Sequence, residues 1–144
     1  MRYQFIHNDD GLVDVSLEDD LPLIRHALED SLGTRPPRGA PQDGPSTYWL
    51  DHAITGLRER MESGGSEPFA SGNITYLQLR GGWVEARLDV DPIDSDIVDR
   101  VEATDLLELL TQWRTVVLEA SPEAASRVPP PRPARPMPPP TSAS

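Results

Sequence analysis

The sequence predicts an α+β domain in which an antiparallel sheet of four to five strands carries three helices on one face. The length favours one domain, since 144 residues suffice for a single modest core. Segments with a two-residue apolar period occur in pairs joined by short turns, which indicates antiparallel strands. Segments with helical spacing lie between and after these pairs, so the helices are expected on one side of the sheet.

The chain begins with a predicted hairpin. Polar and apolar side chains alternate over residues 2–8 and again over residues 12–17. Residues 9–11, Asp-Asp-Gly, lie between these segments and are typical of a turn. The alternation and the turn together predict two antiparallel strands.

Two helices are predicted to follow this hairpin. Leucine and isoleucine recur at helical spacing over residues 17–32, and Gly33 ends the pattern. Residues 33–46 are rich in proline and glycine, which indicates a loop. A second apolar helical face over residues 47–62 includes Trp49, which we expect in the core.

The clearest local pattern is a second hairpin. Residues 74–80 and 83–90 both alternate, and Gly81-Gly82 between them can supply the positive φ angles of a two-residue turn. The aliphatic side chains of both segments fall on one face, which we expect to meet the core. Four other side chains share the opposite face, namely Tyr76, Trp83, Glu85 and Arg87.

The last part of the domain is predicted to hold a short strand over residues 97–101 and a helix over residues 105–119. Residues 121–144 contain nine of the sixteen prolines and no aromatic residue, so they cannot bury enough surface to fold. We therefore expect a single domain over residues 1–120 and a disordered Pro-rich tail over residues 121–144. Within this tail, residues 130–135 (PPRPAR) have the P-x-x-P-x-R form of polyproline ligands, although such a composition more often forms a spacer.

The charge of the chain is strongly acidic and unevenly placed. The net charge is −11, and residues 89–108 hold eight carboxylates but only one cation, Arg100. Nucleic acids and anionic membranes are polyanions, so this balance disfavours both as partners. It favours a basic protein partner, or serves solubility alone.

The composition excludes several classes of chemistry. The chain has no cysteine and no lysine, which excludes thiol chemistry and lysine Schiff bases. The acidic segment fails as a calcium loop, because Val98 and Asp99 stand where a ligand and a glycine are required. No serine nucleophile motif or spaced histidine pair occurs, so we expect no catalytic residue, no metal site and no cofactor.

The same composition bears on where the protein works. Its thirteen basic residues are all arginine, and with abundant alanine, glycine and proline this is typical of a GC-rich bacterial genome. No apolar run is long enough to span a membrane, and the first ten residues lack the apolar segment of a secretion signal. We therefore expect a cytoplasmic protein.

The candidate partner-binding site joins the second hairpin to the acidic segment. If helices cover only one face of the sheet, Tyr76 and Trp83 are exposed on the other, and such aromatic residues are favoured binding anchors. The alternative is that Trp83 packs across its own hairpin. Four carboxylates of the acidic segment are expected to supply charge beside these anchors, namely Asp91, Asp94, Asp96 and Asp99.

A resemblance to a known class of proteins rests on two segments. Residues 76–92 (YLQLRGGWVEARLDVDP) and residues 104–114 (TDLLELLTQWR) together resemble a pattern in small bacterial immunity proteins of polymorphic toxin systems. In that pattern a hairpin with a glycine turn precedes an acidic connection and a helix of the form LLxxW. The resemblance covers less than a quarter of the chain, and it implies a stoichiometric inhibitor that binds a toxin and has no catalytic residues.

Two other functions remain open at this point. The chain is alternatively a scaffold or regulatory accessory protein that recruits a partner through its Pro-rich tail. It is alternatively a small enzyme that uses carboxylates or a bound cation.

Overall fold

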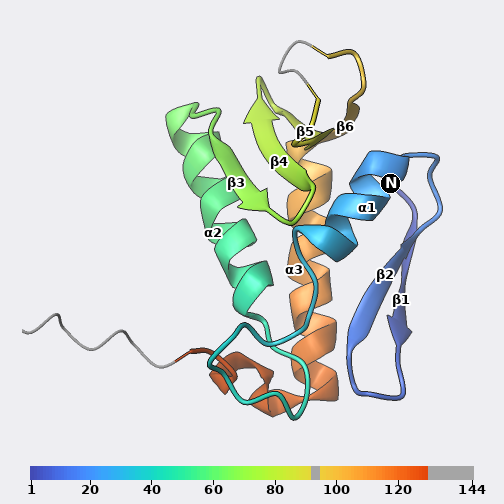
Figure 1. Ribbon diagram of the computed structural model, residues 1–144, viewed down its shortest axis with the longest axis vertical. Helices are drawn as coiled ribbons and strands as arrows, with labels where there is room; N and C mark the ends of the chain where they lie inside the picture. Colours follow the sequence, from blue (N-terminus) through green and yellow to red (C-terminus); the bar gives the residue numbers. More distant parts are fainter. Residues whose placement is uncertain (92–94, 130–144) are drawn as a thin grey trace, which may run out of the picture.

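The structure, a computed structural model, describes residues 1–91 and 95–129 of the chain (Figure 1). Strands and helices follow one another in the order β1 (Tyr3–His7), β2 (Val13–Leu17), α1 (Pro22–Asp30), α2 (Tyr48–Ser63), β3 (Pro68–Ser71), β4 (Thr75–Arg80), β5 (Trp83–Leu88), β6 (Asp99–Glu102) and α3 (Ala103–Ala120), with a final 3-10 turn η1 (Pro122–Ser126). The three predicted helices and both predicted hairpins are present, so the α+β class is confirmed.

The strands form two antiparallel sheets. β1 pairs only with β2, whereas β3, β4, β5 and β6 form a four-stranded sheet in that order. We expected one sheet of four to five strands, and the first hairpin instead stands apart as a ribbon beside α3 (Figure 1). β3 was not predicted, because it has four residues, begins with Pro68 and shifts register against β4 between Pro68 and Ala70.

The core lies between the four-stranded sheet and the helices, which pack together on one side of it (Figure 1). Leu77, Leu79, Val84 and Ala86 of the second hairpin face this core as expected, whereas Val90 lies past the end of β5 and is 81% exposed. α3 supplies the largest share, because its wide apolar face is buried by the sheet, by α2 and by the β1–β2 ribbon. Its fully buried side chains are Leu106, Leu109, Leu110, Trp113 and Val117.

The turn between β4 and β5 confirms the role expected for the glycine pair. Gly81 and Gly82 have φ angles of 57° and 84°, in the region that other residues rarely adopt. The turn fixes a register in which Arg80 lies opposite Trp83 and Gln78 lies opposite Glu85. This register decides which side chains meet on the face that the helices leave free.

The folded domain extends past residue 120, where we expected the tail to begin. In η1, Ala124 is fully buried, and its carbonyl accepts the backbone N–H of Thr47 at the start of α2. Arg127 is 6% exposed, and its guanidinium reaches Asp43, Glu123 and the carbonyl of Pro45 at 3.0–3.1 Å. Residues 121–129 therefore belong to the domain, and the rest of the expected tail (130–144) lies outside the described residues.

α1 is tied to the beginning of β4 by one carboxylate. Asp30 ends the helix, and its oxygens accept the backbone N–H groups of Asn73, Ile74 and Thr75 at 2.9–3.1 Å and the Thr75 hydroxyl at 2.7 Å. A carboxylate at a helix C-terminus is unfavourable by itself, so these donors must offset the helix dipole. Gly72 is required here, because a Cβ at this position would lie 2.3 Å from the Asp30 carbonyl and carboxylate oxygens.

This link predicts acid-sensitive stability. Burial alone would raise the pKa of Asp30, but the hydrogen bonds from Thr75, Ile74 and Asn73 outweigh it and lower the pKa below its ordinary value. A carboxyl whose pKa is lowered on folding stabilises the protein above its unfolded pKa of about 3.9, and this stabilisation is lost as pH falls through the folded pKa. Asp30→Asn is expected to cost about 1–3 kcal/mol at pH 7 and to flatten the decline of stability below about pH 4.

Urea unfolding between pH 2.5 and pH 7 measures both effects. Glu29→Gln, at the exposed neighbouring acid, is the matched control and should stay within about 0.5 kcal/mol of the unchanged chain. An Asp30→Asn chain whose stability falls with acid as steeply as that of the unchanged chain would refute the assignment.

Candidate partner-binding face

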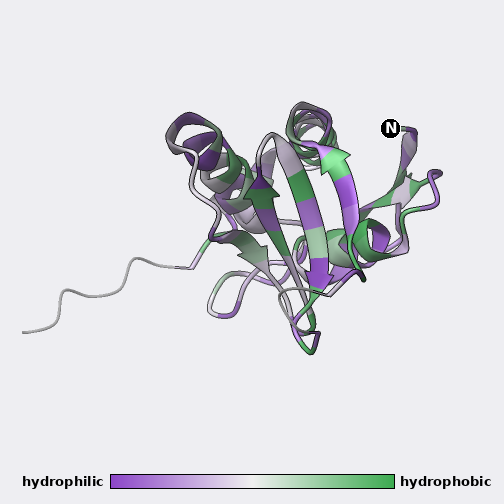
Figure 2. Cartoon of the chain, turned by 90° about the horizontal axis from the view of Figure 1, so that it is seen from above, coloured by the Kyte–Doolittle hydropathy of each residue, from purple (hydrophilic) through white to green (hydrophobic). Residues whose placement is uncertain are grey.

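The candidate site is the outer face of the four-stranded sheet, defined as the side chains of β4, β5 and β6 that point away from the helices. Viewed from above, none of the drawn helices lies over these strands, and polar and apolar positions alternate along them (Figure 2). The β4–β5 register confirms that Tyr76, Trp83, Glu85 and Arg87 share one face. β6 adds two charged side chains to it, because Arg100 lies opposite Glu85 and Glu102 lies opposite Trp83.

Glu85 is the centre of the outer face. Its side chain is 1% exposed, although no helix covers it, because long polar side chains close over it. Four side-chain nitrogen atoms lie within 3.5 Å of its carboxylate oxygens. They belong to Arg100 at 2.8 Å, Gln78 at 3.0 Å, Arg80 at 3.2 Å and Arg87 at 3.5 Å. Three arginines on one carboxylate leave a local excess of positive charge in a protein that is otherwise acidic.

The ionised form of Glu85 is the favoured one. Burial would raise its pKa, but hydrogen bonds from Gln78 and Arg100 and the charges of Arg87 and Arg80 outweigh burial and lower the pKa. The carboxylate is therefore a permanent counter-ion that fixes three arginines in place. It is not a candidate general acid, which would need a raised pKa.

Arg87 is the buried member of this network. Its side chain is 6% exposed, and Nη1 donates to the carbonyl of Ser95 at 2.9 Å in the segment that follows β5. Its Nε has no hydrogen-bond partner among the described residues. Arg80 and Arg100, by contrast, are 56% and 54% exposed, so they present charge to the surroundings.

Trp83 is the exposed aromatic residue of the outer face. It is 46% exposed and lies between Arg80 on β4 and Glu102 on β6. The residue opposite Trp83 on the neighbouring strand is Arg80, and no other aromatic ring stacks on Trp83 within the described chain. Tyr76 lies two rows away, opposite Arg87, and is half-buried.

Three of the four aspartates predicted for the site, Asp91, Asp96 and Asp99, lie among the described residues. Asp96 is exposed, and Asp91 is half-buried with one carboxylate oxygen that lacks a partner among the described residues. Asp94 lies outside the described residues. Asp99 lies opposite Ala86, which points to the core, so its side chain is on the helix side of the sheet.

Asp99 instead caps the N-terminus of α1 with its side chain. One of its carboxylate oxygens accepts the backbone N–H groups of Leu23 and Ile24, in the first turn of that helix. An acceptor at a helix N-terminus satisfies amides that have no partner within the helix, and its charge is favourable with the helix dipole. No local pattern indicates this contact, because the partners are 75 and 76 residues apart.

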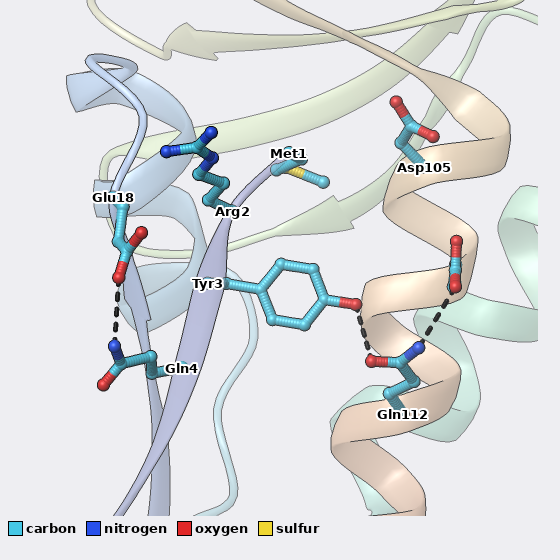
Figure 3. Close-up of a pocket in the computed structure, with 8 residues that line it drawn as sticks. Met1, Arg2, Tyr3, Gln4, Glu18, Asp105 and Gln112 are labelled. Atoms are coloured by element: carbon cyan, nitrogen blue, oxygen red, sulfur yellow. Dashed lines mark hydrogen bonds between the residues drawn. The ribbon is translucent and has the colours of Figure 1, made fainter.

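Part of the remaining acidic segment lines a groove between β1 and α3. The hollow has a volume of about 460 Å³, and Glu18, Asp105 and Glu108 bring carboxylates to it (Figure 3). Tyr3 projects across from β1, and its hydroxyl donates to the Gln112 side chain at 2.7 Å (Figure 3). Burial raises the pKa of Tyr3, and the charges of Glu108 and Asp105 raise it further.

Within residues 1–91 and 95–129, no group of three or more potential metal ligands of the His, Cys, Asp and Glu types comes together. His7, His26 and His52 are all exposed and stand on different elements. None of the described helices combines the length and the apolar character that crossing a membrane requires.

The sequence pattern placed Glu85 and Arg87 on this face but did not indicate Arg80 and Arg100 beside them. Acidic groups were expected near Trp83, whereas the outer face is built from Arg80, Arg87 and Arg100 around Glu85. The register of the second hairpin, which places Arg80 opposite Trp83 and Gln78 opposite Glu85, could have indicated part of this network. The contact of Arg100 with Glu85 also requires the pairing of β5 with β6.

Comparisons of the chain with protein-family models, curated proteins and solved structures find no significant match.

Proposed function

We propose that this chain is a non-catalytic binding protein that holds a protein partner on its outer face, with Trp83 as the central anchor. The observation that carries the proposal is a half-exposed tryptophan on a sheet face that no described helix covers, fixed between Arg80 and Glu102. Tryptophan and arginine are the residues most enriched among those that dominate binding energy. The tight β4–β5 turn also fixes the backbone at Trp83, which reduces the entropy lost on binding.

Net charge and local charge act on different steps of such binding. Residues 1–129 hold all 24 acidic residues and 11 of the 13 arginines, so their net charge is −13. A charge of this size steers a basic partner over long range and raises the association rate. Arg80 and Arg100 act only at contact, where their free N–H groups can meet carbonyl or carboxylate oxygens of the partner.

A toxin is the partner that the resemblance to immunity proteins favours. On this proposal the chain is an inhibitor of a basic toxin, such as a nuclease. Arg80 and Arg100 meet carbonyl or carboxylate oxygens at the contact, and the acidic groups around the outer face meet the basic surface. The exposed acids Asp89 and Asp96, at the end of β5 and beyond it, would flank the contact. The scaffold alternative differs in requiring the Pro-rich tail, which an inhibitor acting through the outer face does not need.

The test is co-expression with the product of a neighbouring gene, which we expect to be a basic protein. The unchanged chain is expected to restore growth and to form a 1:1 complex with that protein. Trp83→Ala should speed dissociation about thirtyfold, the loss typical of a central aromatic anchor, with little change in association. Biolayer interferometry at several salt concentrations measures both rates.

Charge reversal supplies the matched control. Asp89→Arg combined with Asp96→Arg should slow association and weaken its salt dependence while dissociation stays the same. The proposal fails if Trp83→Ala dissociates as slowly as the unchanged chain. It also fails if removal of residues 130–144 abolishes the complex, because the scaffold function would then be the better description.

A further inference from the structure

A second aromatic surface lies at the start of α2, far from the outer face. We expected Trp49 in the core, but it is 39% exposed and begins a ridge of three rings. Its ring meets that of Tyr48 edge to face at 4.9 Å between centroids, and the Tyr48 ring lies 4.4 Å from that of His52. The aliphatic residues of α2 fill the core without Trp49, which leaves the ring free for another contact.

Hollows lie on both sides of this ridge. One of about 190 Å³ separates the three rings from Phe69 on β3, and His52 also borders a neighbouring hollow of about 470 Å³ that reaches Glu59. On its other side Trp49 borders a hollow of about 380 Å³ that includes Glu29. We call this row of hollows, with Tyr48, Trp49 and His52 as its ridges, the α2 groove.

The α2 groove is acidic overall. Five carboxylates line its hollows, namely Asp10, Asp14, Glu29, Asp51 and Glu59, against two cations, Arg35 and Arg60. Asp51 is paired with Arg114, and no hydrogen bond or ion pair within the described chain engages the side chains of Glu29 and Glu59. An aromatic groove flanked by free carboxylates has the chemistry that receives a polyproline helix carrying arginine.

A segment of that chemistry leaves the domain close to the groove. Ser46, two residues before α2, donates to the carbonyl of Arg127 at 2.6 Å, so the last described residues lie beside the start of α2 (Figure 1). Residues 130–144 then contain seven prolines, two arginines and no acid. A polyproline II helix rises about 3.1 Å per residue, so these fifteen residues can extend about 46 Å from the domain.

We propose that the α2 groove binds residues 130–136 of the same chain as a polyproline II helix. Proline rings pack between Tyr48, Trp49 and His52, and Arg132 and Arg135 face the carboxylates of the groove. The domain carries a net charge of −13 and residues 130–144 carry +2, so the two surfaces attract each other. Because Arg127 is held within the domain, the binding of residues 130–136 is intramolecular, which raises the effective concentration of a weak ligand. This proposal goes beyond the partner-binding function and does not depend on it.

Fluorine NMR of the full chain labelled with 5-fluorotryptophan tests the contact directly. The chain has three tryptophans, so Trp83 and Trp113 are internal controls for an exposed and a buried ring. Arg132→Glu combined with Arg135→Glu should shift only the Trp49 resonance and increase its sensitivity to solvent deuterium. An unchanged Trp49 resonance overturns the proposal, and a wild-type resonance that moves on dilution shows that the occupant is the tail of a second copy.

A synthetic peptide of residues 130–144 provides the second measurement. The chain with both arginines reversed has an open groove and should bind the peptide at 1:1 stoichiometry, whereas the unchanged chain should bind it several-fold more weakly. Trp49→Ala in the open chain should lower the affinity about tenfold, and Trp83→Ala should leave it unchanged. Equal affinity for the Trp49→Ala and Trp83→Ala chains, or no binding to the open chain, refutes the groove as the site.

Discussion

Replacing Trp113 with alanine is expected to lower the free energy of unfolding by about 3–5 kcal/mol, enough to threaten a domain of this size. The ring is 1% exposed on α3, in the core that the sheet, α2 and the first hairpin share. Its Nε1 donates to the carbonyl of Val13 at 2.8 Å, so the substitution removes both apolar contacts and the link from α3 to β2. Urea unfolding followed by circular dichroism measures the loss.

Two matched variants separate the causes of this loss. Trp113→Phe keeps most of the apolar volume and should cost less, including about 1 kcal/mol for the missing hydrogen bond. Trp83→Ala removes the same side chain from the outer face and should cost less than about 1 kcal/mol, since the ring is 46% exposed. Equal losses for Trp113→Ala and Trp83→Ala would contradict the assignment of core and face.

Glu85→Ala is expected to cost about 3 kcal/mol, which is large for a side chain that no helix covers. The loss arises mainly at Arg87, whose 6% exposed guanidinium would keep its charge without a counter-ion. Arg80 and Arg100 are more than half exposed and can regain water, so their ion pairs contribute little. Glu102→Ala, on the same face but exposed, should stay within about 0.5 kcal/mol.

A double-mutant cycle shows whether Arg87 is the cause. Glu85→Ala combined with Arg87→Ala should be more stable than Glu85→Ala alone, because the second change removes the uncompensated buried charge. Additive losses in the two single variants would mean that Glu85 acts through Gln78 or through packing instead. The same variants report on the proposed site, since both alter the surface on which Trp83 stands.

Local patterns predicted most of the elements. Alternation and paired glycines predicted the second hairpin with its faces, and helical periodicity placed α2 and α3 within two residues of their observed bounds. α1 ends at Asp30, before the predicted stop at Gly33, and Leu17 of the leucine pattern belongs to β2. β3 carries no such pattern in its four residues, so only its pairing with β4 defines it.

The contacts that position the site depend on partners far apart in the sequence. Asp99 reaches α1 and Asp30 reaches the start of β4 across more than forty residues, so neither role follows from its neighbours. The burial of Glu85 requires that β6 pair with β5 in one register, which alternation alone does not specify. Trp49 was expected in the core but is exposed. Helical spacing indicates which side chains share a face of a helix, but it does not indicate how far the core extends around that helix.

The cluster around Arg127 has a mechanical consequence. Its guanidinium and carbonyl join η1 to the loop before α2, at the point where the described chain ends. A pull on residues beyond 129 would therefore load several hydrogen bonds at once, between two segments more than eighty residues apart. Without this cluster the same force would peel η1 away from α3 one contact at a time. Tension applied beyond Arg127 is therefore resisted by the whole cluster.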